Sequence, residues 1–208
     1  SLTTNVDSGA STILRAKAIG EVRNSIGMRL IRARNLLGTG KDCWVGKFEV
    51  TEAEYEKVMG ADANKSAFKG PDLPVENVTW LQAQAFCDKL TQVDSKPPPG
   101  YAGHYGLPTV EQWLQLEKGT DLKTAVIEAS QPAAVGSKGA ANSTGVSDIL
   151  GNVREWLASD DPKNRQHVGG SFKSRAGFRG MAAFLNPEQY DGASPEVGFR
   201  VIWLPAQQ

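Results

Sequence analysis

Short stretches in which apolar and polar residues alternate predict that the chain contains several β-strands. The first stretch covers residues 24–32. Its side chains Ile26, Met28 and Leu30 fall on one face and Arg29 on the other, as the two-residue period of a strand requires. Three further short stretches are rich in β-branched and aromatic residues and are also interpreted as strands. They are residues 43–50, 167–172 and 197–203.

Capping residues predict three helices between these strands. Thr51 and Glu54 match a capping box, and the helix that they open stops at Gly60. A second helix covers residues 80–92, and Thr109 caps a third. Strands, capped helices and long connecting segments together indicate an α+β fold.

The remaining segments are rich in Gly, Pro, Ser and Ala and are expected to be irregular. Residues 61–76, 120–144 and 173–196 connect the helices and strands. Residues 1–23 are weakly patterned and are interpreted as a linker or an N-terminal arm. Since 208 residues suffice for one sizeable core, residues 24–208 are expected to form a single domain.

Charge balance and cysteine content exclude several classes of function. The 23 basic and 23 acidic residues cancel, which argues against a broad surface for nucleic acids or anionic membranes. No apolar run approaches the length of about 18 residues that membrane insertion needs. Cys43 and Cys87 have no second cysteine or histidine at the spacing of a zinc site.

Residues 145–156 hold the densest group of unusual residues. The carboxylates Asp148 and Glu155 stand on either side of Gly151. Two carboxylates and the intervening carbonyls can converge on one hard cation such as calcium, which prefers oxygen ligands. The same residues also fit a capped turn and a half-buried strand, with both carboxylates bonded to the backbone. The spacing differs from that of an EF-hand and leaves both interpretations open.

Seven short motifs follow one another along residues 24–203. They are Asn-Ser-Ile-Gly-Met (24–28), Lys-Phe-Glu-Val-Thr (47–51), Pro-Val-Glu-Asn-Val-Thr-Trp (74–80), Gly-Leu-Pro-Thr (106–109) with Gln112 and Trp113, Asp-Ile-Leu-Gly-Asn-Val-Arg-Glu-Trp (148–156), Gly-Gly-Ser (169–171) and Gly-Phe-Arg (198–200). In this order they resemble the formylglycine-generating-enzyme (sulfatase-modifying-factor) domain family. The resemblance implies a C-type-lectin-like α+β fold with short twisted antiparallel strands, two or three helices and much irregular chain.

The resemblance also implies a structural calcium ion, because the family binds one through the segment that matches residues 148–155. The ligands carried over are two side chains and two backbone carbonyls, those of Asp148 and Glu155 and those of Gly151 and Val153. Arg154 replaces the aromatic residue that usually precedes the glutamate, and it places a cation near the site.

The oxidase chemistry of the family is not expected here. The oxidases use two cysteines after Gly-Gly-Ser, whose thiolates bind copper, and soft thiolates are what Cu(I) requires. Ser174 and Arg179 stand at those places and supply no thiolate, so we predict neither copper binding nor enzymatic activity. A second branch, the iron-dependent sulfoxide synthases, needs a histidine cluster, and this chain has only His104 and His167.

Binding without catalysis is the function that the resemblance favours, through the surface that corresponds to the active-site groove. Six residues there offer aromatic, cationic and hydroxyl groups, and aromatic and arginine residues are enriched in interface hot spots. They are Phe172, Lys173, Ser174, Arg175, Phe178 and Arg179. We predict a monomeric domain of a larger bacterial protein that binds a protein or a small-molecule ligand. An ordinary solvated loop, with its aromatic residues tucked into the core, is the alternative.

A second hypothesis is a retroelement-diversified variable protein. Such proteins share the fold and carry hypervariable residues just upstream of a C-terminal Gly-Phe-Arg strand. Residues 172–196 occupy that place here. Arg200 of the motif is expected to be a structural arginine that pairs with a buried carboxylate or with carbonyls. Whether such a domain acts in the cytoplasm or at the cell surface depends on its flanking sequence.

Overall fold

Threonine side chains begin all three α-helices that the described residues contain. The helices are α2 (Glu52–Met59), α3 (Trp80–Val93) and α4 (Val110–Glu117). Thr51, Thr79 and Thr109 each accept a hydrogen bond from the third helical N–H, and Glu or Gln at that position bonds back to the threonine N–H. Each helix therefore starts with a complete capping box, which satisfies backbone donors that a helix leaves free.

The computed structural model describes residues 20–36, 38, 42–100, 102–161, 163–176, 188–189 and 192–206. A five-stranded antiparallel sheet has the order β1-β2-β3-β9-β4. Its strands are β1 (Glu21–Arg23), β2 (Arg29–Ala33), β3 (Cys43–Gly46), β4 (Gly103–Gly106) and β9 (Ile202–Pro205). β1 lies just before residue 24, where the domain was predicted to start, and it pairs with β2 at the edge of this sheet.

A smaller four-stranded sheet has the order β7-β6-β5-β8. Its strands are β5 (Arg154–Trp156), β6 (Gln166–Val168), β7 (Glu188–Gln189) and β8 (Val197–Gly198). The β5–β8 pair is parallel and the others are antiparallel. The predicted strand over residues 197–203 is thus two strands, and residues 199–201 cross from the small sheet to the large one. Two 3-10 turns, η1 (Ala61–Ala63) and η2 (Leu122–Thr124), complete the regular structure of the described residues.

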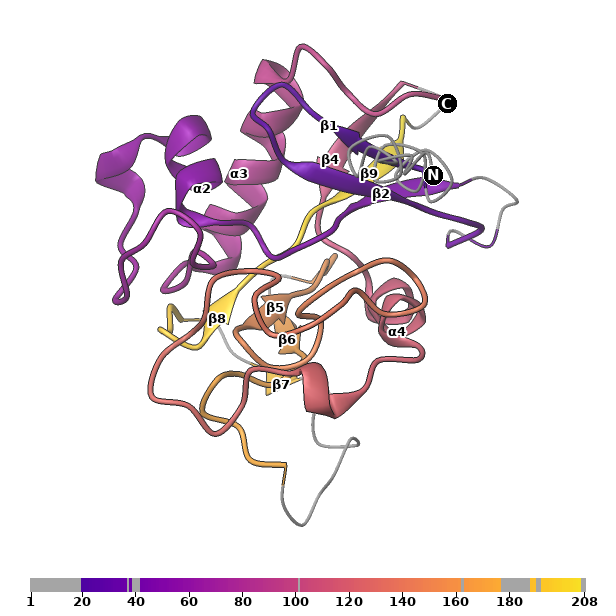
Figure 1. Ribbon diagram of the computed structural model, residues 1–208. Helices are drawn as coiled ribbons and strands as arrows, with labels where there is room; N and C mark the ends of the chain where they lie inside the picture. Colours follow the sequence, from indigo (N-terminus) through magenta and orange to yellow (C-terminus); the bar gives the residue numbers. More distant parts are fainter. Residues whose placement is uncertain are drawn as a thin grey trace, which may run out of the picture.

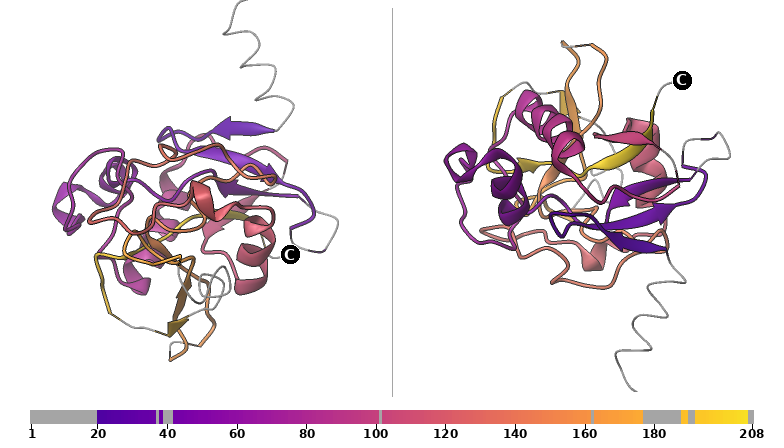
Figure 2. Two further views of the ribbon diagram at one scale, coloured as in Figure 1. Left: turned by 60° about the horizontal axis from the view of Figure 1, so that its bottom comes forward. Right: turned by 90° about the horizontal axis from the view of Figure 1, so that it is seen from above.

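The large sheet separates two hydrophobic cores. Strand alternation sends Leu30 and Trp44 into the core that includes α2 and α3, where Tyr55 stacks on Phe86 at 5.6 Å between ring centroids. The alternate residues of the same strands enter the core under α4, which includes Trp113. Figure 1 shows α2 and α3 together on one flank and α4 near the smaller sheet, and Figure 2 shows the same flank from above.

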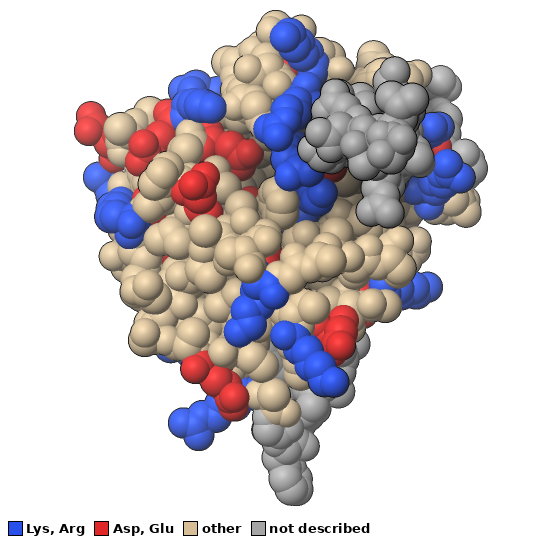
Figure 3. Space-filling view, in the orientation of Figure 1, with Lys and Arg blue, Asp and Glu red and all other residues tan. Residues whose placement is uncertain are grey.

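Charges are mixed on the surface. In the orientation of Figure 1, acidic side chains gather over the α2 side, and basic side chains are spread over the rest of that face (Figure 3). Helix α2 itself carries acidic residues in its first turn. Within the described residues, no helix has the length and apolar character needed to cross a membrane.

Gly151 occupies a position that a side chain would disturb. Its φ of +80° lies in the left-handed region, and a Cβ atom would stand 2.4 Å from the Val126 carbonyl oxygen. The backbones meet there because Val126 and Gly151 form an isolated parallel bridge. The glycine therefore allows residues 126 and 151 to pair at close range, as glycine in a strand pattern often does.

Substituting Gly151 by alanine is expected to destabilise the domain more than the same change at Gly60. Gly60 also has a positive φ, +92°, but a Cβ there would meet no atom within 4 Å. Gly60→Ala should cost about 1–3 kcal/mol from the backbone alone, because a φ of 92° with a ψ of 150° is almost confined to glycine. Gly151→Ala should cost about 2 kcal/mol more from overlap with Val126. Urea unfolding of both variants measures the difference, and equal losses would show that the close approach to Val126 does not matter.

Candidate functional site

The segment after β6 turns the first predicted ligand-binding residue inward. Phe172 is wholly buried, and its ring lies edge-on to Phe68 with 5.4 Å between centroids. Its N–H donates to the Asn152 carbonyl at 2.7 Å, and its carbonyl accepts from the Ala129 N–H at 2.8 Å. The Phe172 ring therefore lies in the core rather than on the surface.

The next three residues reach the surface. The ammonium group of Lys173 lies 3.2 Å from a carboxylate oxygen of Glu196. The Ser174 hydroxyl accepts a hydrogen bond from the Ser171 N–H at 2.9 Å and so closes the turn. Arg175 is exposed and makes no hydrogen bond or ion pair with the described part of the chain. Of the predicted binding groups that the structure describes, the Arg175 guanidinium is therefore the most available.

Neither cysteine reaches this surface. Cys43 lies in β3 and Cys87 in α3, and both are wholly buried, in different cores. Burial raises the pKa of Cys43 to about 12, and it also raises the pKa of Cys87. Both groups are therefore neutral thiols at physiological pH rather than reactive thiolates. The predicted residues Phe178 and Arg179 lie outside the described residues.

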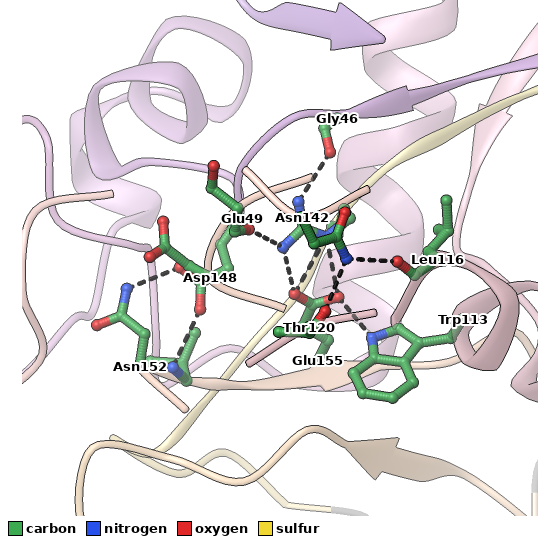
Figure 4. A network of polar contacts seen from close by, with 12 residues as sticks. Gly46, Glu49, Trp113, Leu116, Thr120, Asn142, Asp148, Asn152 and Glu155 are labelled. Carbon is green, nitrogen blue, oxygen red and sulfur yellow. Dashed lines mark hydrogen bonds and ion pairs between the residues drawn. The ribbon is translucent and has the colours of Figure 1, made fainter. Parts of the chain in front are cut away.

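A buried ion pair joins the two sheets, and Figure 4 shows Glu155 and Gly46 of the network around it. Arg200, on the crossing segment, and Glu155, on β5, are both fully buried, with 2.7 Å between the guanidinium Nη2 and the carboxylate Oε1. The guanidinium also donates to the Gly46 carbonyl at 2.8 Å and to the Ser147 carbonyl at 2.9 Å. Burial opposes the charge of Arg200, but the Glu155 carboxylate raises the pKa of the guanidinium. The prediction of a structural arginine paired with a carboxylate and carbonyls is confirmed.

Protein donors surround the Glu155 carboxylate. Oε1 accepts from Nε and Nη2 of Arg200, and Oε2 accepts from Nε of Arg200 and from the Trp113 indole N–H at 2.9 Å. These contacts occupy the roughly four acceptor positions of a carboxylate. A calcium ion at Glu155 would have to compete with the Arg200 guanidinium, so this carboxylate does not fit the predicted ligand role as it stands.

The other predicted calcium ligands are spread around this pair. Asp148 accepts a hydrogen bond from the Gly136 N–H, and burial raises the pKa of its carboxyl. Gly151 donates its N–H to the Gly169 carbonyl, and Val153 donates its N–H to the Glu49 carboxylate. In the described residues, no three His, Cys, Asp or Glu side chains are grouped so as to hold a metal. Calcium binding itself stays a prediction.

One carboxylate of the network, that of Glu49, was not predicted. Glu49 accepts hydrogen bonds from the Asn152 side-chain amide at 2.7 Å and from the Val153 N–H at 3.1 Å. Burial raises the pKa of Glu49 well above its usual value, and the nearby Asp148 and Glu155 carboxylates add to this effect. Glu49 stands in the Lys-Phe-Glu-Val-Thr motif of residues 47–51, but its neighbours in the sequence indicate neither its burial nor its partners.

Breaking the ion pair from one side is expected to be costly. Arg200→Met leaves the Glu155 carboxylate buried without its partner, and it should lower the free energy of unfolding by about 3–5 kcal/mol. Glu155→Met is the other single variant, and replacing both residues by Met removes both charges. The free energy of unfolding of the double variant should therefore fall by at least about 1 kcal/mol less than the sum of the two single losses. Urea unfolding of the three variants forms the cycle, and strictly additive losses would contradict the coupling.

His167 lies beside the same strand and is buried in its neutral form. It pairs with Trp156 across β5 and β6, and the two rings meet at 5.3 Å between centroids. Burial and the nearby Arg154 charge lower the pKa of His167 from 6.5 to about 4. Protonation in the folded state is therefore disfavoured, whereas the unfolded chain takes up the proton near pH 6.5.

Acidification is expected to destabilise the domain through His167. The pKa of His167 is lower in the folded state than in the unfolded chain. Its contribution to the free energy of unfolding is therefore complete above pH 6.5 and is lost as the pH falls from there toward about 4. His167→Phe keeps an aromatic ring and removes the titration, so it should lose less stability between pH 7.5 and pH 5 than the native chain. Urea midpoints at the two values measure this, and identical losses would contradict a role for His167.

Comparison with solved structures identifies the fold. Treponema denticola variable protein 1 is 24% identical, with a TM-score of 0.64 over 79% of this chain and 85% of that one. PvdO from Pseudomonas aeruginosa is 17% identical, with a TM-score of 0.62 over 79% of this chain and 81% of that one. At such identities the likeness concerns the fold alone, and the predicted C-type-lectin-like α+β architecture is confirmed.

Sequence comparison identifies the family. The chaperone protein LppX of Paenibacillus barcinonensis is 27% identical over an alignment 232 residues long. The alignment covers 79% of this chain and 81% of the relative. The family model for the sulfatase-modifying factor enzyme 1-like domain matches residues 34–124 and 117–205. These ranges span most of the seven motifs, and the chain belongs to this FGE-sulfatase domain family.

Proposed function

We propose that this chain is a non-catalytic member of the family that binds a partner protein through the surface of residues 173–175. The observation that carries the proposal is the burial of Cys43 and Cys87, which both lie in hydrophobic cores. Ser174, at the place of one family cysteine, uses its hydroxyl to close a backbone turn. Without an accessible thiolate, the copper-dependent oxidation has no metal ligand and no nucleophile.

The groups on this surface favour a protein as the partner. Arg175 is exposed beside the Lys173–Glu196 ion pair, and the backbone of the segment is anchored by the buried Phe172. A fixed turn that presents a guanidinium group suits a protein interface, where arginine is enriched among the residues that matter most for affinity. The name of LppX, a chaperone protein, also supports a protein partner.

Capture from a lysate of the source cells, followed by affinity measurement with the purified partner, tests the proposal. Arg175→Gln should weaken the partner's affinity by about tenfold or more, as loss of an interface arginine does. The matched control is Arg34→Gln, which removes an exposed arginine at the far end of β2 and should leave the affinity unchanged. Equal affinities of the native chain and Arg175→Gln would contradict this site.

Two alternatives predict other outcomes. For an oxidase, incubation with copper, a reductant and a Cys-x-Pro-x-Arg peptide would consume the peptide thiol and form an aldehyde, which would overturn the proposal. A diversified receptor, which the likeness to the Treponema denticola variable protein favours, would show codons 172–196 that differ among cells of one culture. Invariant codons would remove that alternative and leave the binding module.

A further inference from the structure

A cavity of about 350 Å³ lies between the end of β2 and α4, and none of residues 173–175 lines it. Figure 1 shows these two elements on the same side of the domain. The described residues that line the cavity come from three segments, and they include Arg34, Leu36, Gln115, Leu116, Ser143 and Thr144. Its volume lies in the range of small-molecule sites.

The β2 wall of the cavity is fixed by one carboxylate. Asp42 accepts a hydrogen bond from the Asn35 N–H at 3.1 Å and pairs with the Arg32 guanidinium at 2.6 Å. Asn35 takes the left-handed conformation, with φ of +51°, and so turns the chain after β2. The guanidinium of Arg32 is paired with Asp42, whereas Arg34, on the same turn, has no such partner among the described residues.

The opposite wall is fixed by hydroxyl and amide groups at the end of α4. Thr144 donates to the Leu116 carbonyl at 2.7 Å, and the Asn142 amide donates to the same carbonyl at 2.8 Å. Ser143 donates to the Lys118 carbonyl at 3.0 Å. The carbonyls that end a helix carry partial negative charge, and here they are already satisfied. The cavity therefore offers little to a cation.

The remaining groups suit an anion with a short apolar body. Leu36 and Leu116 are 5% and 1% exposed and form an apolar floor. Arg34 is exposed and makes no hydrogen bond or ion pair with residues that the structure describes. Gln115 adds an amide, and no Asp or Glu is among the described lining residues. An unpaired guanidinium above an apolar floor matches a carboxylate or phosphate head group with a small hydrocarbon tail.

We propose that this cavity binds a small organic anion, with the head group on Arg34 and the hydrocarbon part against Leu36 and Leu116. The walls are held by internal hydrogen bonds on both sides, so the site is formed before the ligand arrives, which limits the entropy lost on binding. The protein then has two separate binding surfaces, one for a partner protein and one for a small anion.

NMR titration of the full 208-residue chain tests the proposal with three probes, namely hexanoate, phenyl phosphate and the neutral hexanamide. At least one anion should shift the backbone amide signals of Leu36, Gln115 and Leu116 in a saturable way, and hexanamide should not. The anion that binds more tightly identifies the head group. Absence of saturable shifts with both anions, or equal binding of hexanamide, would overturn the proposal.

Three variants separate a built site from general charge attraction. Arg34→Gln should weaken binding of the anion by about tenfold, the usual effect of losing a charge-assisted hydrogen bond. Gln115→Glu places a carboxylate in the wall and should also weaken it. Lys89→Gln, on the exposed side of α3 and outside the cavity, changes the net charge by the same amount and should leave the affinity unchanged. The proposal fails if Arg34→Gln binds as the native chain does, or if Lys89→Gln is equally impaired.

Discussion

The ion pair of Arg200 and Glu155 is the interaction on which the arrangement of the two sheets depends. One guanidinium contacts the end of β3, the loop at Ser147 and the carboxylate of β5. Removing two charges from water is costly, and a buried pair is tolerated only when its hydrogen-bonding capacity is satisfied. Here Trp113 from α4 supplies the remaining donor. Elements that are distant in the sequence are thereby held in one relative position.

The surface of residues 173–175 depends on this ion pair although it contacts neither the Arg200 guanidinium nor the Glu155 carboxylate. Asn152 lies three residues before Glu155, and its carbonyl accepts the N–H of Phe172. The turn that presents Lys173 and Arg175 is therefore tied to the strand that carries the ion pair. A rigid platform of this kind keeps its shape when the residues on it change.

Local sequence signals predicted the parts of the fold that depend on neighbouring residues. The capping boxes at Thr51 and Thr109 give the helix starts correctly, because a cap and its partner are three residues apart. The burial of Phe172 and the role of Glu49 could not be read in this way. Each depends on contacts with segments far away in the chain, at Phe68 and at Asn152. The sequence predicted that Arg200 would pair with a buried carboxylate or with carbonyls. It did not identify Glu155 as the partner, because nothing in the spacing of the two residues indicates it.

The strand order of the large sheet affects how the chain can fold during synthesis. β9 is the last strand in the sequence, yet it lies between β3 and β4 and separates the two cores. While β9 is still inside the ribosome, β3 and β4 have unpaired edges at its place in the sheet, and the apolar residues on both faces of the sheet are incompletely covered. The large sheet and its two cores are therefore completed only once β9 has emerged, and the open strand edges and apolar faces favour aggregation until then.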